Sequence, residues 1–207
     1  MKHYLRTMLI VMLGSFLCSG CSTTIHVKQD MPFNPREGRI NKSVALYVKP
    51  ESQAFSRSGS HAGGSCTVEF GKALVPNATK SLSQVFNKVV ILSQMDKNTV
   101  SQSGAEYLIQ IHFNDNTEVQ VGATTFASHK IIVSLNCMIA DTKTETRVFQ
   151  ESVRVEKEKG SAAGYLPLPP FSTWGWQNAL QEAAGESLQN ALEKINDKIL
   201  ENKDKFR

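Results

Sequence analysis

Histidine, cysteine and serine are the residue types that could give this chain a metal site or a nucleophile, but their spacing predicts neither. Four histidines follow the first 20 residues, and none has another histidine, a cysteine or a carboxylate at a known zinc-ligand spacing: His26, His61, His112 and His129. The glycines at 59, 63 and 64 lack the Lys-Ser/Thr ending of a phosphate-binding loop. No serine stands in a G-x-S-x-G pattern. The sequence therefore predicts a protein that is not an enzyme and holds no cofactor and no metal.

Charge and hydropathy limit the partners of this 207-residue chain, a length that suits one domain. It has 23 basic and 19 acidic residues, a formal net charge of +4. Without Lys2 and Arg6, which lie in the N-terminal segment, the chain has 21 basic and 19 acidic residues. Binding to nucleic acid needs a concentrated basic face, so this partner is not expected. The one long apolar run is N-terminal, which excludes a bundle of membrane-spanning helices.

The N-terminal segment has the three parts of a secretory signal peptide. The basic start contains Lys2, His3 and Arg6, and the ten largely apolar residues that follow are 8–17. The segment ends in small residues, Cys18-Ser19-Gly20-Cys21. Ten residues rise about 15 Å as a helix, half of a hydrocarbon core of about 30 Å. We therefore predict a signal peptide over residues 1–20 rather than a permanent span. The Cys-x-x-Cys spacing at 18 and 21 is typical of redox or metal pairs, but it falls at the cleavage site.

The end of this segment resembles the lipobox of bacterial lipoproteins, with Ser19 and Gly20 as the small residues before Cys21. The resemblance implies that Cys21 becomes the first residue and carries acyl chains, which together hold a protein firmly on a bilayer. Ser22 in place of an aspartate implies transfer to the outer membrane, with the folded part facing the periplasm. The alternative is ordinary secretion, with Cys21 as a free or bridged thiol.

The segment after Cys21 predicts a flexible tether over residues 21–42. It is polar, contains Pro32 and Pro35 and shows no sustained apolar period. About twenty extended residues could reach on the order of 65 Å. We expect the folded periplasmic domain at 43–202 and a frayed tail at 203–207.

Cys66 and Cys137 remain as an even pair in an oxidising compartment. A disulfide between them would close a loop of about seventy residues and could stabilise the fold by about 4 kcal/mol. The alternative is two small buried thiols on neighbouring strands.

Apolar periodicity predicts two amphipathic helices and six strands. One helix has its apolar stripe over Leu74–Phe86, and the other runs from near Trp174 to near Asn202. The strands are expected at 43–49, 66–70, 89–92, 107–113, 130–140 and 146–155. The short link after Asp141 suits an antiparallel hairpin. We therefore predict a single α+β domain with a mainly antiparallel sheet, partly open to water, and both helices packed on one face.

This order of elements resembles a group of small periplasmic lipoproteins. The resemblance rests on G-K-A-L-V-P-N-A-T-K-S-L-S-Q-V-F followed by V-V-I-L, then G-A-E-Y-L-I, and a terminal helix with W-x-x-A-L-x-x-A. The group includes the N-terminal part of CsgG, PelC and the YajG-type lipoproteins, and the match spans residues 43–200. It is one of element order and apolar pattern, so it implies a fold and carries over no functional residue.

Residues 164–176, G-Y-L-P-L-P-P-F-S-T-W-G-W, hold three prolines and four aromatic residues. Proline lowers the entropy lost when an extended segment docks, and aromatic residues supply much of the contact energy at interfaces. The segment is thus a candidate contact for a partner or ligand, through Tyr165, Leu166, Phe171, Trp174 and Trp176. The alternative is that Phe171, Trp174 and Trp176 fold inward and cap the sheet.

Three functions follow from these features. The first is an outer-membrane lipoprotein that acts as an accessory or scaffold in envelope assembly or export, through contacts with an envelope protein or with itself. The second is a binding module for an apolar or glycan ligand of the envelope. The third, an envelope hydrolase, would need a catalytic set that forms only in three dimensions.

Overall fold

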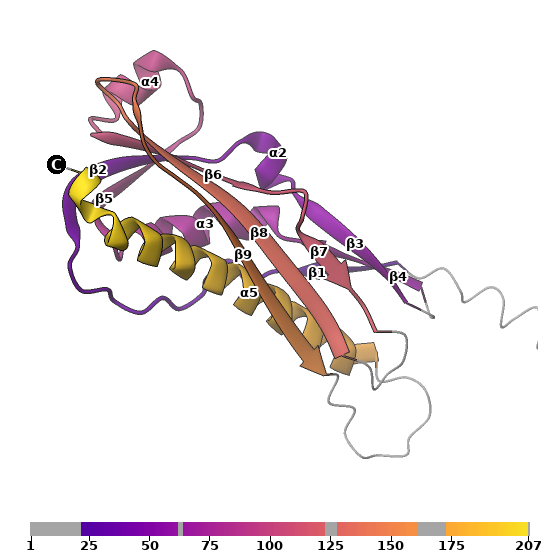
Figure 1. The fold of residues 1–207 in the computed structure, drawn as a ribbon. Coiled ribbons are helices and arrows are strands. Elements are labelled where there is room, and N and C mark those ends of the chain that lie inside the picture. Colours follow the sequence, from indigo (N-terminus) through magenta and orange to yellow (C-terminus); the bar gives the residue numbers. More distant parts are fainter. Residues whose placement is uncertain (1–21, 62–63, 123–127, 161–172, 207) are drawn as a thin grey trace, which may run out of the picture.

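The computed structural model describes residues 22–61, 64–122, 128–160 and 173–206. These residues form one α+β domain with two longer helices, as the sequence predicts, and with two sheets (Figure 1). No helix of the described part is long and apolar enough to cross a membrane.

The larger sheet has six strands in the order β5-β2-β6-β8, with β7 and β9 both paired to β8. Their bounds are β2 Ile40–Tyr47, β5 Phe86–Leu92, β6 Tyr107–Phe113, β7 Glu118–Gln120, β8 Ser128–Asp141 and β9 Arg147–Gly160. β8 pairs antiparallel with β6, β7 and β9, but β2 pairs parallel with both β5 and β6. The sheet is therefore mixed, because the long connections that leave β2 and β5 let the chain cross over and re-enter in the same direction.

A second, three-stranded sheet was not expected. Its order is β1-β4-β3, with β1 Ser22–His26, β3 Ser56–His61 and β4 Gly64–Glu69. β1 pairs parallel with β4, and β3 pairs antiparallel with it. β3 approaches β7 so closely that a Cβ on Gly59 would lie 2.8 Å from the backbone oxygen of Val119. Glycine is thus required where the two sheets meet.

Helices α3 (Gly71–Leu82) and α5 (Thr173–Glu201) cover one face of the larger sheet, as expected (Figure 1). The side chains of β8 that face them are fully buried in one core, at alternate positions: Ile131, Val133, Leu135, Cys137 and Ile139. This period of two fixes which face of the strand packs inward. Two short helices, α2 (Pro50–Gln53) and α4 (Lys97–Gln102), lie in the connections.

The tether predicted over residues 21–42 is wrong for the described residues that follow Cys21. After β1 the chain crosses α3 and α5 as a fixed strap, residues 27–39, with Val27 and Met31 buried in the core. Asn77 of α3, itself fully buried, accepts a hydrogen bond from the Met31 amide (2.9 Å) and donates one to the Lys28 carbonyl (2.9 Å). The segment looked polar because its few apolar residues follow neither the helix nor the strand period.

The tail predicted to be frayed is also ordered up to Phe206. A short 3₁₀ turn, Lys203–Lys205, brings the Phe206 ring inward, where it is 4% exposed. Its centroid lies 5.2 Å from that of Tyr107 and 5.8 Å from that of Phe86. A single aromatic residue after a charged run therefore closes the core at the end of α5.

Candidate binding groove

The face of the larger sheet away from α3 and α5 carries the groove that we consider as a binding site. Strand register places Leu108 of β6 opposite Ala140 of β8, and Gln110 opposite Met138. All four side chains line a cavity of about 830 Å³. The sequence predicts a sheet face of this mixed character, because the alternate residues of β8 are both polar and apolar: Ile132, Ser134, Asn136 and Met138.

Two segments wall the groove above this floor. One wall is the start of α4 with the two residues before it, and its lining residues are Met95, Asp96, Lys97, Val100 and Ser101. The other wall is the turn that joins β8 to β9, and its lining residues are Asp141, Thr142, Lys143 and Glu145. An ion pair between Lys97 Nζ and Glu145 Oε1 (3.1 Å) joins the two walls. The groove therefore combines an apolar floor with a charged rim.

The α4 wall is attached by few contacts. Asp96 caps the helix, accepting from the Thr99 amide at 2.9 Å. No residue of α4 is buried, and only its half-buried Val100 packs on the small apolar cluster beneath, formed by Ala45, Leu92, Ala105 and Leu108. Met95 beside it is 50% exposed. A wall held this way can shift to admit a ligand, and methionine side chains adapt readily to different apolar shapes.

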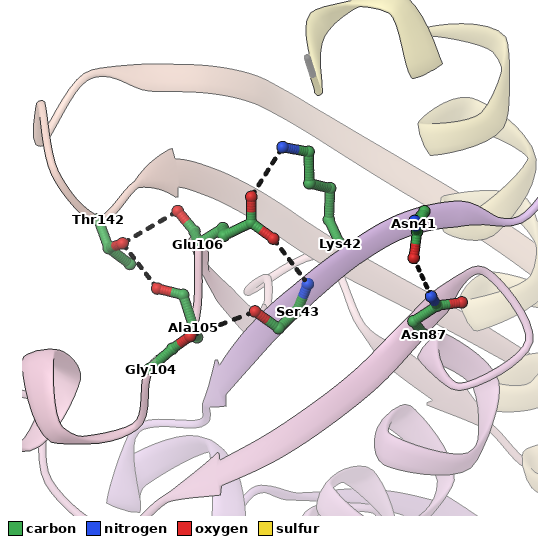
Figure 2. A network of polar contacts seen from close by, with 8 residues as sticks. All are labelled: Asn41, Lys42, Ser43, Asn87, Gly104, Ala105, Glu106 and Thr142. Carbon is green, nitrogen blue, oxygen red and sulfur yellow. Dashed lines mark hydrogen bonds and ion pairs between the residues drawn. The ribbon is translucent and has the colours of Figure 1, made fainter.

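The rim at the other end is held by a polar network centred on Glu106 (Figure 2). The Glu106 carboxylate accepts from Lys42 Nζ (2.7 Å) and from the Ser43 amide (3.4 Å). The Thr142 hydroxyl donates to the carbonyls of Ala105 (2.7 Å) and Glu106 (3.0 Å). These bonds join β2, the start of β6 and the β8–β9 turn, as Figure 2 shows, so the rim is fixed while the α4 wall is not.

Hydrogen bonds shift the pKa values of the charged groups of the rim away from neutrality. A hydrogen bond from Lys42 lowers the pKa of Glu106, and the same bond raises the pKa of Lys42. Bonds from the Thr144 and Lys143 amides lower the pKa of Asp141, and bonds from Thr99 lower the pKa of Asp96. A general acid or base works best with a pKa near the operating pH, and all of these shifts point away from neutrality.

Most residues of the predicted contact segment lie outside the described part of the chain, so the contact stays a prediction. Tyr165, Leu166 and Phe171 lie outside the described residues, as does the side chain of Trp174, whose backbone is in the first turn of α5. Trp176 is half-buried against the main core, with its ring centroid 6.3 Å from that of His129. The alternative in which the side chain folds inward thus applies to Trp176. Cys21 also lies outside the described residues.

The disulfide considered between Cys66 and Cys137 is not formed. Both residues are free, buried thiols, one on β4 of the small sheet and one on β8 of the large sheet. Burial raises the pKa of both thiols, that of Cys137 to about 12. The alternative of two buried thiols therefore applies, but their strands are not neighbours because they belong to different sheets.

The groove itself was not predicted from the sequence. The stretch 93–105 looked like a polar connection, although an aspartate followed three positions later by a threonine is a helix-start signal. The strand pairing that brings this stretch beside the β8–β9 turn cannot be deduced from local pattern. Within the described ranges, no three histidine, cysteine or carboxylate side chains gather closely enough to hold a metal ion.

Comparison with known proteins shows the fold. The sequence matches no protein-family model and no curated protein. A Xanthomonas campestris protein of the DUF330 family has a similar structure, with a TM-score of 0.56 and 9% identity over 87% of this chain and 96% of its own. A minor lipoprotein from Acinetobacter baumannii has a TM-score of 0.45 and 11% identity, over 80% of this chain and 95% of its own.

The PelC dodecamer from Paraburkholderia phytofirmans is a further similar structure, with a TM-score of 0.43 and 12% identity over 78% of this chain and 92% of its own. At such identities these likenesses concern the fold alone. The chain thus shares its fold with the Xanthomonas campestris protein.

Proposed function

We propose that this chain is an envelope lipoprotein, anchored to the outer membrane by acyl chains on Cys21, whose folded domain faces the periplasm. It acts without catalysis, as an accessory or scaffold in envelope assembly or export, through contacts with another envelope protein or with copies of itself.

The observation that carries this proposal is the short distance in sequence between Cys21 and the fold. The lipobox-like end of the N-terminal segment stops at Cys21, and Ser22 is a residue of β1. Removal of residues 1–20 would leave the described pairing of β1 with β4 intact, because it includes Ser22 with Ser65 and the residues that follow. The described fold thus lies within the chain that remains after removal of the signal peptide.

Acylation is tested in a Gram-negative host by comparing Cys21→Ala with Cys18→Ala. Both variants remove a cysteine from the same short motif, but only Cys21 is the proposed attachment site. We expect wild type and Cys18→Ala to incorporate a palmitate analogue and to fractionate with the outer membrane, and Cys21→Ala to do neither. Membrane association and labelling that survive Cys21→Ala would refute the anchor.

The accessory role is tested by chemical crosslinking in intact cells that express the wild-type chain. A scaffold should give one or a few defined adducts, with a second copy or with one envelope protein. The same adducts should be lost in Cys21→Ala if membrane anchoring brings the partners together. Exclusively monomeric protein after thorough crosslinking would contradict the role.

A second candidate, a binding module for an apolar or glycan ligand, is favoured by the groove of about 830 Å³. Native mass spectrometry of the purified protein should then show a retained small molecule. Two exposed apolar residues provide a matched comparison: Met95 lines the groove, and Ile91, 53% exposed, does not. Met95→Ser should lower the retained fraction and Ile91→Ser should leave it unchanged; equal retention in both would exclude the groove as the site.

A further inference from the structure

We propose that the end of the domain formed by the start of β1 and the adjoining ends of β3 and β4 lies against the lipid leaflet. β8 then leads away from the bilayer, and the groove is presented to the periplasm far from the membrane. This inference rests on the acylation of Cys21 proposed above, and it adds the orientation of the domain and its contact with a phospholipid surface.

The first argument is the length of chain between the anchor and the fold. Ser22 is already a strand residue, in register with Ser65 of β4. One residue spans at most about 3.6 Å, so an acylated Cys21 holds Ser22 close to the headgroups. The predicted tether would have let the domain swing on the order of 65 Å from the bilayer. With β1 paired and the strap fixed on α3 and α5, that freedom is lost and one end of the domain must face the leaflet.

The second argument is the distribution of charge along the domain. Three residues at the strand ends beside the anchor are exposed serines: Ser22, Ser60 and Ser65. Their hydroxyl groups can donate hydrogen bonds to phosphate or ester oxygens of lipids. The opposite end carries the charged rim of the groove, with Lys97, Asp141, Lys143 and Glu145 among its residues. Bringing charges out of water is costly, so these serines suit contact with the interface better than the charged rim does.

The third argument is the extent of β8, which spans much of the domain (Figure 1). Its 14 residues cover about 45 Å at about 3.3 Å each. Its last residue, Asp141, lies in the groove rim, and Figure 1 shows the strand running lengthwise through the domain, with its end at the β8–β9 turn on the side of α4. Figure 1 also places α4 at the opposite end of the domain from the free ends of β3 and β4. The fold therefore acts as a spacer between membrane and groove.

Nitroxide quenching of site-specific fluorophores tests this orientation. The full-length acylated protein is reconstituted into vesicles of phosphatidylethanolamine and phosphatidylglycerol that carry a nitroxide on a fraction of the headgroups. Single labels are attached at Ser60→Cys, Ser56→Cys and Lys143→Cys, all at exposed positions. The two native thiols of the domain are buried and so should not react in the folded protein. Ser60 and Ser56 share strand β3 and differ by about 13 Å in distance from its free end.

We expect quenching several-fold stronger at position 60 than at 56, and no quenching at 143 beyond that of a soluble control. Insertion of 15 Gly/Ser residues between Cys21 and Ser22 should remove this gradient while the protein stays vesicle-bound. Equal quenching at the three positions, or the strongest at 143, in acylated and vesicle-bound protein would overturn the orientation and leave the anchor intact. Protein that lacks acyl chains and does not bind vesicles would overturn both the orientation and the proposed anchor.

Discussion

Asn77→Ala is the substitution that tests most directly whether residues 27–39 form a fixed strap. The side chain of Asn77 is fully buried on α3. Its Oδ1 accepts from the Met31 amide, and its Nδ2 donates to the carbonyls of Lys28 and Ala73. Alanine removes all of these bonds while keeping the helix, so its effect reports on the strap.

The magnitude follows from the groups left without a partner. A buried amide that loses its acceptor costs about 1–3 kcal/mol, and the loss of an ordinary hydrogen bond costs about 1 kcal/mol. The Met31 amide is buried and the Lys28 carbonyl is partly buried. Alanine regains about 0.5 kcal/mol through its higher helix propensity. We therefore expect Asn77→Ala to lower the free energy of unfolding by about 2–3 kcal/mol.

Urea unfolding followed by circular dichroism measures this loss. With a slope of about 2–3 kcal/mol per molar urea, the midpoint should fall by about 1 M. Asn178→Ala, at an exposed position of α5, makes the same exchange in a helix and should stay within about 0.5 kcal/mol of wild type. Hydrogen exchange should also show faster opening at the Met31 amide. Equal midpoints for the two variants, with the Met31 amide still protected, would refute the strap.

Other consequences of the structure can be measured on the same protein. Gly59→Ala should lower the melting temperature, because its Cβ would meet a backbone oxygen of β7 at 2.8 Å and overpacking costs about 1–3 kcal/mol. Gly160→Ala, with open space around its Cβ, should leave the melting temperature unchanged. Equal melting temperatures of the two variants would contradict the close approach of β3 to β7. Cys66 and Cys137 should resist alkylation at pH 8 until urea unfolds the chain, and peptide mass spectrometry counts the alkylated cysteines. Alkylation of either cysteine in the native protein would show that they are not buried. The lowered pKa of Glu106 means that its carboxylate stabilises the fold above about pH 4.5 and that this contribution is lost as pH falls. Glu106→Gln should therefore lower the unfolding midpoint at pH 7 and not at pH 3. An equal effect at both pH values would count against the ion pair of Glu106 with Lys42.

Elements with a sustained period could be predicted from the sequence. The helix near Trp174–Asn202 is found as α5, and the long strands around Asp141 are found as β8 and β9. The turn between them matches as well, since the Asp141 carboxylate accepts from the amides of Lys143 and Thr144 at 2.8 Å. In each case the apolar positions of one element already define its buried face. The α+β class follows from these elements without any long-range information.

Features that depend on pairing between distant segments could not be predicted. The parallel partners of β2 are brought to it by crossovers, and β1 is a strand only because β4 offers it an edge. Five residues such as Ser22–His26 bury too little apolar surface to fold alone. The groove is of the same kind, because α4 and the β8–β9 turn are about forty residues apart in the chain and meet only across the sheet.

The sequence by itself determined the class of the fold and the long periodic elements of its main core, since these depend on local residue types and their period. Tertiary structure alone decided that the segment after Cys21 is a strand and a strap rather than a tether, and that two cysteines are separate core residues. Burial of a few apolar side chains, together with hydrogen bonds from α3 and α5, stabilises a segment that has no structural preference of its own.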